Sequence, residues 1–271
     1  YVPQIVKRIE LNSSPDQIVT SGNVAYLANG SQGLAIWDVT DPLQPTQIAT
    51  YPTPSYAIAV AVHDRVLYLT DLDEGLQLYR IAQTGTLISL GSFTPLGQTM
   101  ESVIVQNTAF AIGGSRGDLH CIDLTNPKQG QQIARHEQAG FIHDVAYVDP
   151  YLYVTGEATG LRVFDLRHAE QPPIEYPLSA SSIFATPRYL YLGDRSGNLL
   201  ILDATNPNRL HSIAAYPDGG YVNGMAVADG FAYLYHGEIG MRILKINSTG
   251  EITEVGVFRS TKHIRKILIV G

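Results

Sequence analysis

The chain has 271 residues, of which 45% are hydrophobic and 16% charged, so it can bury a large core and is too apolar to be a disordered protein. Its formal net charge is −7 and it contains no run of Lys and Arg, which argues against nucleic acid as a partner. The longest apolar stretches, such as Tyr56–Val62, are as long as a strand and too short to insert into a membrane.

The first part of the chain is typical of four short strands. We expect strands at Gln17–Ser21, Val24–Ala28, Leu34–Val39 and Thr46–Tyr51. Each run is rich in Val, Ile, Leu or Tyr and is bounded by Gly, Pro, Asn or Asp, which is the pattern of strands joined by tight turns. No window carries an apolar period of 3.6 residues long enough for a helix.

This four-stranded unit is repeated six times. An aromatic residue recurs every 38 to 43 residues, and a Gly followed directly or one residue later by Leu or Met comes six or seven residues after it. The aromatic positions are Tyr26, Tyr68, Phe110, Tyr153, Tyr191 and Tyr233. Four short antiparallel strands repeated radially form a β-propeller, in which each repeat is one blade. We therefore predict that residues 1–271 form a single all-β propeller domain.

The third strand of several units resembles the LVIVD repeat. The matching segments are Leu34-Ala35-Ile36-Trp37-Asp38, Leu119-His120-Cys121-Ile122-Asp123, Leu161-Arg162-Val163-Phe164-Asp165 and Leu199-Leu200-Ile201-Leu202-Asp203. The resemblance implies a bacterial or archaeal propeller, extracellular or periplasmic, with the cytoplasm as the alternative. Because the Asp recurs, we expect it to accept N–H bonds from the following turn. Arg80 and Lys245 replace it in units two and six, where the outer turns should differ.

The two ends of the chain raise the question of how the propeller closes. Val2–Leu11 has the spacing of a fourth strand, and Ile264–Gly271 resembles a first strand. We predict that six complete repeats are joined by a partial seventh blade shared by both termini. A six-bladed ring is the alternative.

Function is expected where side chains do not repeat. The loops before the first strand and between the second and third strands of each blade meet on one face, where they can vary without disturbing the packing. The residues expected to bind a ligand there, at the mouth of a central channel, are Asp16, Glu101, His143, Asp144, Asn223, Glu157, Arg195 and His236. No cofactor is expected, although Asp71, Asp73 and Glu74 are of the ligand type that suits Ca²⁺.

Two functions fit these features. The first is a non-catalytic binding or scaffold propeller that binds a protein or a glycan on the loop face. The alternative is a propeller hydrolase or lyase with a polar site at the channel mouth, with or without Ca²⁺. The sequence carries no nucleophile elbow, phosphate-binding glycine loop or His-Glu-x-x-His segment, so no reaction is indicated by a motif.

Overall fold

The structure, a computed structural model, describes 24 strands and two short 3-10 turns. It describes residues 5, 7–83, 85–93, 99–105, 108–113, 118–126, 130–137, 142–156, 160–168, 170–194, 196–217, 219–236, 240–247, 250–260, 264, 266, 267 and 269. Within these residues no helix is long and apolar enough to cross a membrane. The chain divides into two compact units, residues 5–138 and residues 139–271, which are described separately below.

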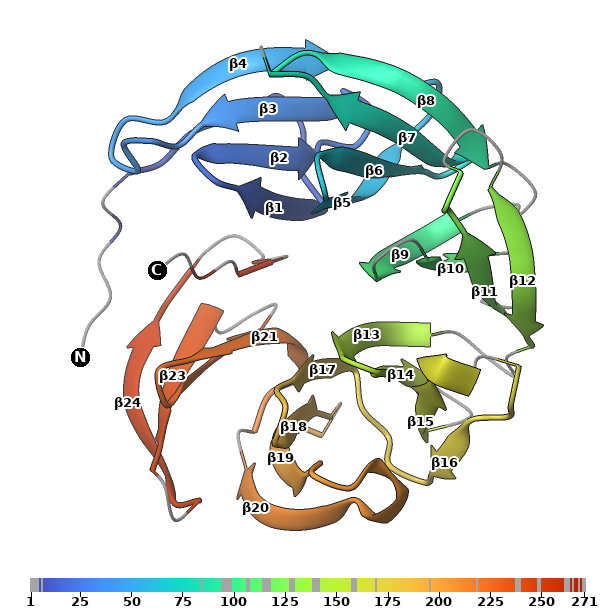
Figure 1. The fold of residues 1–271 in the computed structure, drawn as a ribbon. Coiled ribbons are helices and arrows are strands. Elements are labelled where there is room, and N and C mark those ends of the chain that lie inside the picture. The colour runs from blue at the N-terminus through green and yellow to red at the C-terminus, as the bar shows by residue number, and fades with distance from the viewer. Residues whose placement is uncertain are drawn as a thin grey trace. The chain divides into compact units, whose positions relative to one another are not determined.

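The first unit holds three four-stranded antiparallel sheets, called blades one to three. Their strands are β1 (Gln17–Ser21), β2 (Val24–Ala28), β3 (Leu34–Asp38) and β4 (Thr46–Tyr51); β5 (Ala57–His63), β6 (Val66–Asp71), β7 (Gly75–Ile81) and β8 (Leu87–Phe93); and β9 (Thr99–Val105), β10 (Thr108–Gly113), β11 (Asp118–Asp123) and β12 (Gln131–His136). Within this unit β5 lies between β1 and β9, so the first strands of the three blades are neighbours (Figure 1).

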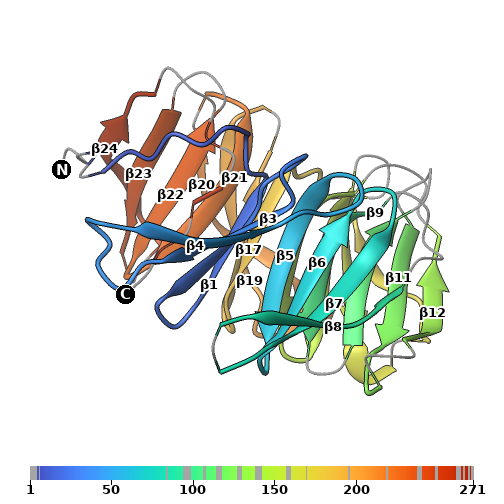
Figure 2. The same cartoon turned by 90° about the horizontal axis from the view of Figure 1, so that it is seen from above.

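The second unit holds blades four to six. Their strands are β13 (Ile142–Val148), β14 (Tyr151–Gly156), β15 (Gly160–Asp165) and β16 (Ile174–Tyr176); β17 (Ser182–Ala185), β18 (Tyr189–Gly193), β19 (Asn198–Asp203) and β20 (His211–Pro217); and β21 (Val222–Ala228), β22 (Phe231–His236), β23 (Gly240–Ile246) and β24 (Ile252–Phe258). The 3-10 turns η1 (Leu166–His168) and η2 (Pro207–Arg209) follow β15 and β19. Figure 2 shows β22, β23 and β24 of blade six side by side.

The described residues therefore form an all-β propeller of six four-stranded blades, which agrees with the six-bladed alternative and does not support the predicted seventh blade. The described residues of the two terminal segments, 5 and 7–11 at one end and 264, 266, 267 and 269 at the other, belong to no strand. A closing strand would bury one apolar face, yet the side chains of Ile5 and Ile9 are exposed. Leu11 instead packs beside Trp37 and Ile18 against blade one, which covers a blade face without adding a strand.

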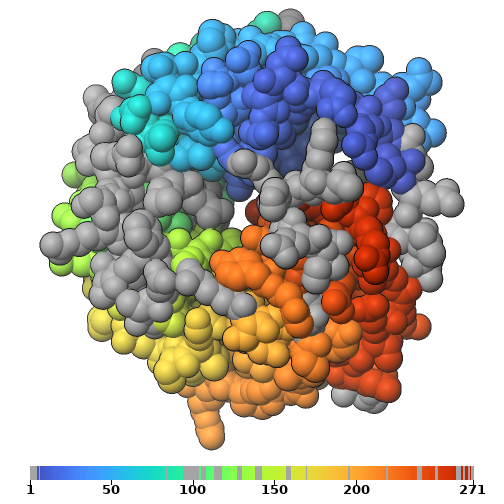
Figure 3. Space-filling model, turned by 180° about the vertical axis from the view of Figure 1, so that it is seen from behind, coloured from blue at the N-terminus to red at the C-terminus, as the bar shows by residue number. Residues whose placement is uncertain are grey.

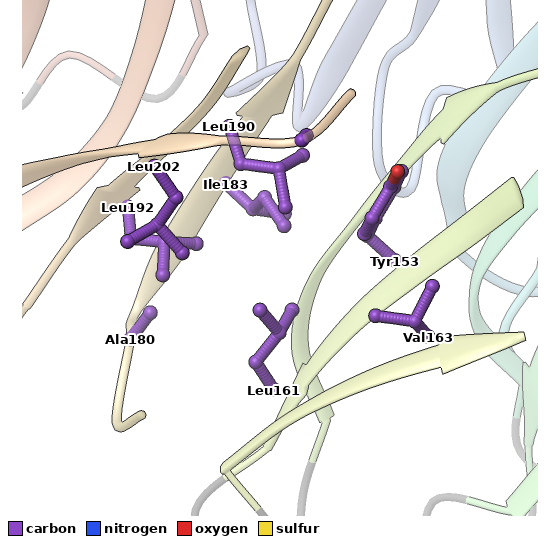
Figure 4. Close-up of a cluster of buried hydrophobic side chains, with 9 residues drawn as sticks. Tyr153, Leu161, Val163, Ala180, Ile183, Leu190, Leu192 and Leu202 are labelled. Carbon is purple, nitrogen blue, oxygen red and sulfur yellow. The ribbon is translucent and has the colours of Figure 1, made fainter. Parts of the chain in front are cut away.

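The core lies between consecutive blades. Each recurrent Leu at the start of the third strand is fully buried, as at Leu34, Leu161 and Leu199. Figure 4 shows such a cluster, in which Tyr153, Leu161 and Val163 of blade four face Ile183, Leu190, Leu192 and Leu202 of blade five. Atoms of blades five and six are likewise in contact in the space-filling view, orange to red (Figure 3). The recurrent Leu residues and most of the recurrent aromatic residues are thus packing positions.

The recurrent Gly before this Leu has a backbone reason. Gly33, Gly160 and Gly197 have φ values of 77°, 69° and 83°, in the left-handed region that other residues disfavour. A Cβ at each would collide with backbone atoms of the fourth strand or the residues after it. Glycine is therefore required where the third strand starts.

The recurrent Asp ends the third strand as predicted. A carboxylate oxygen of Asp38, Asp123, Asp165 and Asp203 accepts an N–H bond from the residue two positions later, at 2.8, 2.8, 3.1 and 2.9 Å. These bonds hold the turn towards the fourth strand. Hydrogen bonding lowers the pKa of each carboxyl from its ordinary value.

Candidate functional site

The first strand of four blades contains a β-bulge near its start. The extra residue is Ile58 in β5, Met100 in β9, His143 in β13 and Asn223 in β21. A bulge leaves one residue without a ladder partner and redirects its side chain. Two of the predicted site residues, His143 and Asn223, are thus bulge residues.

Blades one and five have no such bulge. Asp16 and Ser181 stand directly before β1 and β17, and their N–H groups donate to the carbonyl oxygens of Ala28 and Gly193 at 2.9 and 2.7 Å. Ser181 is buried and its hydroxyl is 2.8 Å from the carbonyl oxygen of Val222 in blade six. Its side chain therefore joins two blades.

The predicted site residues are not equally available. Asn223 is exposed, while His143 and Asp16 are half-buried, and each of the three takes part in a polar or ring interaction. Glu101 lies in β9 opposite Ile112, and its side chain is outside the described part of the structure. Glu157 and Arg195 also lie outside the described residues.

Asp144 holds two blades together. Its Oδ1 accepts the N–H of Val145 in its own strand, and its Oδ2 accepts the N–H of Ile183 in β17, both at 2.9 Å. Burial raises the pKa of Asp144 above its ordinary value, while attraction to Lys266 and the two N–H bonds oppose that rise. The carboxylate is desolvated, and both of its oxygens are already used by backbone groups.

Gln17 makes the same connection in the first unit. Its Oε1 accepts the N–H of Val60 in β5 at 2.6 Å. Gln17 and Asp144 occupy equivalent positions, and Val60 and Ile183 are equivalent as well. The sequence did not indicate this role of Gln17, because Gln and Asp are different residue types and their shared contact is visible only in the structure.

A second connection ties the two loops of one blade end together. The loop between the second and third strands is called the B–C loop, and the loop before the first strand is called the D–A loop. A polar side chain at the end of the second strand bonds to the preceding D–A loop in three blades. The three bonds are Ser13 Oγ to Asn29 Oδ1 at 2.6 Å, the Ser55 N–H to Asp71 Oδ2 at 3.0 Å, and His236 Nδ1 to the carbonyl oxygen of Tyr221 at 3.1 Å.

His236 therefore has a structural contact. It is 2% exposed and is the last residue of β22 rather than a loop residue. In blade five the equivalent Asp194 instead accepts two bonds from Asn198, one from the backbone N–H at 2.8 Å and one from the side chain at 2.7 Å. A polar residue that recurs at the end of the second strand is therefore a sequence signal for a side chain that bonds to a neighbouring loop.

The acidic B–C loop of blade two is organised by backbone bonds. Asp71 is fully buried, and its Oδ1 accepts the N–H groups of Asp73 and Glu74 at 3.2 and 3.1 Å. Asp73 accepts the hydroxyl of Ser55 at 2.6 Å. Within the described residues no group of three His, Cys, Asp or Glu side chains is placed to hold a metal ion. The contacts of Asp71 fit a loop that is stabilised by its own N–H groups.

Comparison with protein families identifies the LVIVD repeat at residues 14–53 and 179–216, which confirms the resemblance in blades one and five. No curated protein matches the chain.

Solved structures with the same fold are distant in sequence. A chain of the mitotic checkpoint complex is 13% identical with a TM-score of 0.73, covering 98% of this chain and 89% of its own. The computationally designed protein Ika8 is 12% identical with a TM-score of 0.71, covering 96% and 79%. A putative 6-phosphogluconolactonase from Bacteroides fragilis is 12% identical with a TM-score of 0.70, covering 89% and 83%. At such identities these similarities establish the fold alone.

Proposed function

We propose that this chain, an LVIVD-repeat propeller, is a non-catalytic scaffold that binds a protein partner through its D–A and B–C loops. The observation that carries the proposal is the set of bulges at Ile58, Met100, His143 and Asn223. The residue type at this one position differs from blade to blade, whereas the packing positions around it repeat. Loop residues that differ from blade to blade, on blades that all pack alike, are suited to recognition of one asymmetric partner.

The loop bonds support this proposal. The pairs Asn29–Ser13, Asp71–Ser55 and His236–Tyr221 fix D–A loops to B–C loops before any ligand binds. A loop that is already ordered loses less conformational entropy on binding, so more of the contact energy contributes to affinity. Braced loops therefore favour a preformed binding surface.

The contacts of Asp144 speak against a catalytic role for that residue. A general base must reach a substrate proton, and both oxygens of Asp144 accept backbone N–H groups instead. The enzyme alternative then depends on His143, Asp16 and Glu101. Because one solved structure of the same fold is named a putative lactonase, lactone hydrolysis is the reaction to assay.

The proposal is tested by site-specific photo-crosslinking in extracts of the source cells. A photoreactive residue at exposed Asn223 should capture one discrete protein, and the same residue at exposed Ser212 on β20 should not. Alanine at Asn223 should then weaken binding of the identified protein. Equal capture from both positions would refute the loop surface. Binding to a glycan array would indicate a glycan partner, and lactone hydrolysis lost in His143→Ala would indicate an enzyme.

A further inference from the structure

A pocket lies between blades five and six, at the strand ends that are farthest from the D–A and B–C loops. Its volume is about 320 Å³, which is in the range of small-molecule sites. Apolar and aromatic residues that are buried or half-buried contribute to its lining: Tyr189, Tyr191, Ile201 and Val227. The rim carries the turn residues Thr186, Asp229 and Asn247 together with Ile213 of β20. All of these residues belong to the second unit.

The pocket follows from a difference between two outer turns. At the junction of blades four and five, the hydroxyl of Tyr176 donates to the carbonyl oxygen of Pro207 at 2.7 Å and accepts the N–H of Leu210 at 3.3 Å. Buried Pro207 begins the η2 turn and Leu210 directly follows it, and Asn206 caps the start of the turn. The Asn-Pro turn of blade five is thus fixed across the junction.

Blade six lacks the Asn-Pro sequence, and its outer turn has another shape. There β23 and β24 continue pairing as far as Ile246 and Ile252, and Gly250 donates to the carbonyl oxygen of Asn247 at 3.0 Å. The hydroxyl of Tyr216, the equivalent of Tyr176, has no hydrogen bond to any described residue. The narrow hairpin therefore leaves Asn247 and Gly250 at the edge of an open pocket.

Polar groups around the pocket are available to a ligand. Asp229 is exposed and has a φ of 51°, and none of the described residues bonds to its carboxylate. Tyr191 is only 6% exposed, and neither its hydroxyl nor that of Tyr189 is bonded to a described residue. Both phenol hydroxyls can therefore donate to a ligand in the pocket.

The charges at the pocket select a neutral ligand. The guanidinium of Arg188 lies 5.0 Å from the centre of the Tyr189 ring, so a cation already occupies that aromatic face and would repel another. The carboxylate of Asp229 on the rim would repel an anion. A neutral ligand that fits the pocket would have an apolar face that packs against the Tyr and Ile side chains. It would also have hydroxyl groups that bond to Asp229 and the Tyr hydroxyls. A sugar ring has this two-faced character.

We propose that the pocket between blades five and six binds a neutral sugar ring, with Asp229 accepting ligand hydroxyl groups. This site lies at the other ends of the strands from the loops of the proposed function and does not depend on it.

The test is saturation-transfer NMR and calorimetry on the full chain with a panel of neutral hexoses and pentoses. At least one sugar should bind, and Asp229→Asn should weaken it at least about tenfold, because a charge-assisted hydrogen bond is lost. Asn tolerates the left-handed backbone, so the turn should be kept. Asp64→Asn is the matched control, since Asp64 has a φ of 46° in the equivalent turn of blade two.

A second variant tests the pocket itself. Ile213 is 41% exposed on the rim, so Ile213→Trp should fold and close the pocket, abolishing sugar binding. Ile133→Trp, at the equivalent bulge of β12, should leave binding unchanged. The proposal is overturned if no sugar of the panel binds, if binding survives both Asp229→Asn and Ile213→Trp, or if the pocket takes a peptide and no sugar.

Discussion

Removal of the Asp144 side chain tests whether this carboxylate holds blades four and five together. Asp144→Ala takes away the acceptor of two N–H groups, those of Val145 and Ile183. Each buried donor without an acceptor costs about 1–3 kcal/mol, and loss of the buried charge offsets part of this. We expect a net loss of about 2 kcal/mol, which lowers Tm by roughly 4–8 °C in a protein of this size.

The pH dependence separates the charge of Asp144 from its hydrogen bonds. The folded-state pKa of Asp144 is raised above the ordinary value of 3.8. Between these two pKa values the folded chain binds a proton that the unfolded chain has lost, so the contribution of Asp144 to stability falls as pH rises through this window. Asp144→Asn cannot ionise and keeps one acceptor. The Tm of wild type relative to this variant should therefore decline from about pH 4 towards neutrality.

Differential scanning calorimetry at several pH values makes the measurement, and Gln17→Ala is the matched control. Gln17 accepts one N–H, that of Val60, and carries no charge. Its removal should cost about 1 kcal/mol with no pH dependence of its own. A Tm for Asp144→Ala within 2 °C of wild type, or a pH-independent difference between wild type and Asp144→Asn, would refute the reasoning.

Three further outcomes are expected from the contacts of the second unit and from the one cysteine. Asp203→Ala should lower Tm more at pH 7 than at pH 3, because bonds from Thr205 lower the pKa of Asp203 and its contribution is lost as pH falls through that pKa; an equal effect at both pH values in calorimetry would contradict this. Tyr176→Phe removes a hydroxyl that bonds twice and should cost about 1 kcal/mol in denaturant unfolding, whereas Tyr216→Phe should cost nothing. Burial raises the pKa of Cys121 to about 12, so the folded chain should not react with a thiol reagent at pH 8 and the unfolded chain should; rapid reaction of the native protein would show that the thiol is accessible.

Local sequence determines most of the fold. The strands Gln17–Ser21, Val24–Ala28 and Thr46–Tyr51 have the bounds that the sequence predicts, because alternation and turn residues act within a few positions. The number of blades does not follow in the same way. Val2–Leu11 and Ile264–Gly271 have strand-like spacing, but a strand forms only where another strand completes its hydrogen bonds. That partner is not encoded in the segment itself.

The candidate site residues were chosen for their variation between blades, and the structure shows contacts that this variation does not indicate. His143 and Asn223 were singled out by their variation, and both are bulge residues, which a sequence without pairing register cannot reveal. Asp144 and His236 were singled out for the same reason, and they make structural contacts between blades and between loops. Their roles depend on the N–H or carbonyl group that faces them, which belongs to a residue distant in sequence.

Variation between blades therefore needs a second criterion before it indicates function. Gln17 and Asp144 differ in charge and length, yet each accepts the N–H of the equivalent residue in the next blade. A structural contact with a backbone group can be made by any acceptor of suitable reach, so selection for packing alone permits such substitutions. At the bulge position the extra residue has no ladder partner on the neighbouring strand. Ile58, His143 and Asn223 differ in polarity as well as in size, and no single backbone contact could be satisfied by all three. The bulge positions therefore lack the shared backbone contact that Gln17 and Asp144 make, and the proposed binding role of His143 and Asn223 is tested by the crosslinking experiment above.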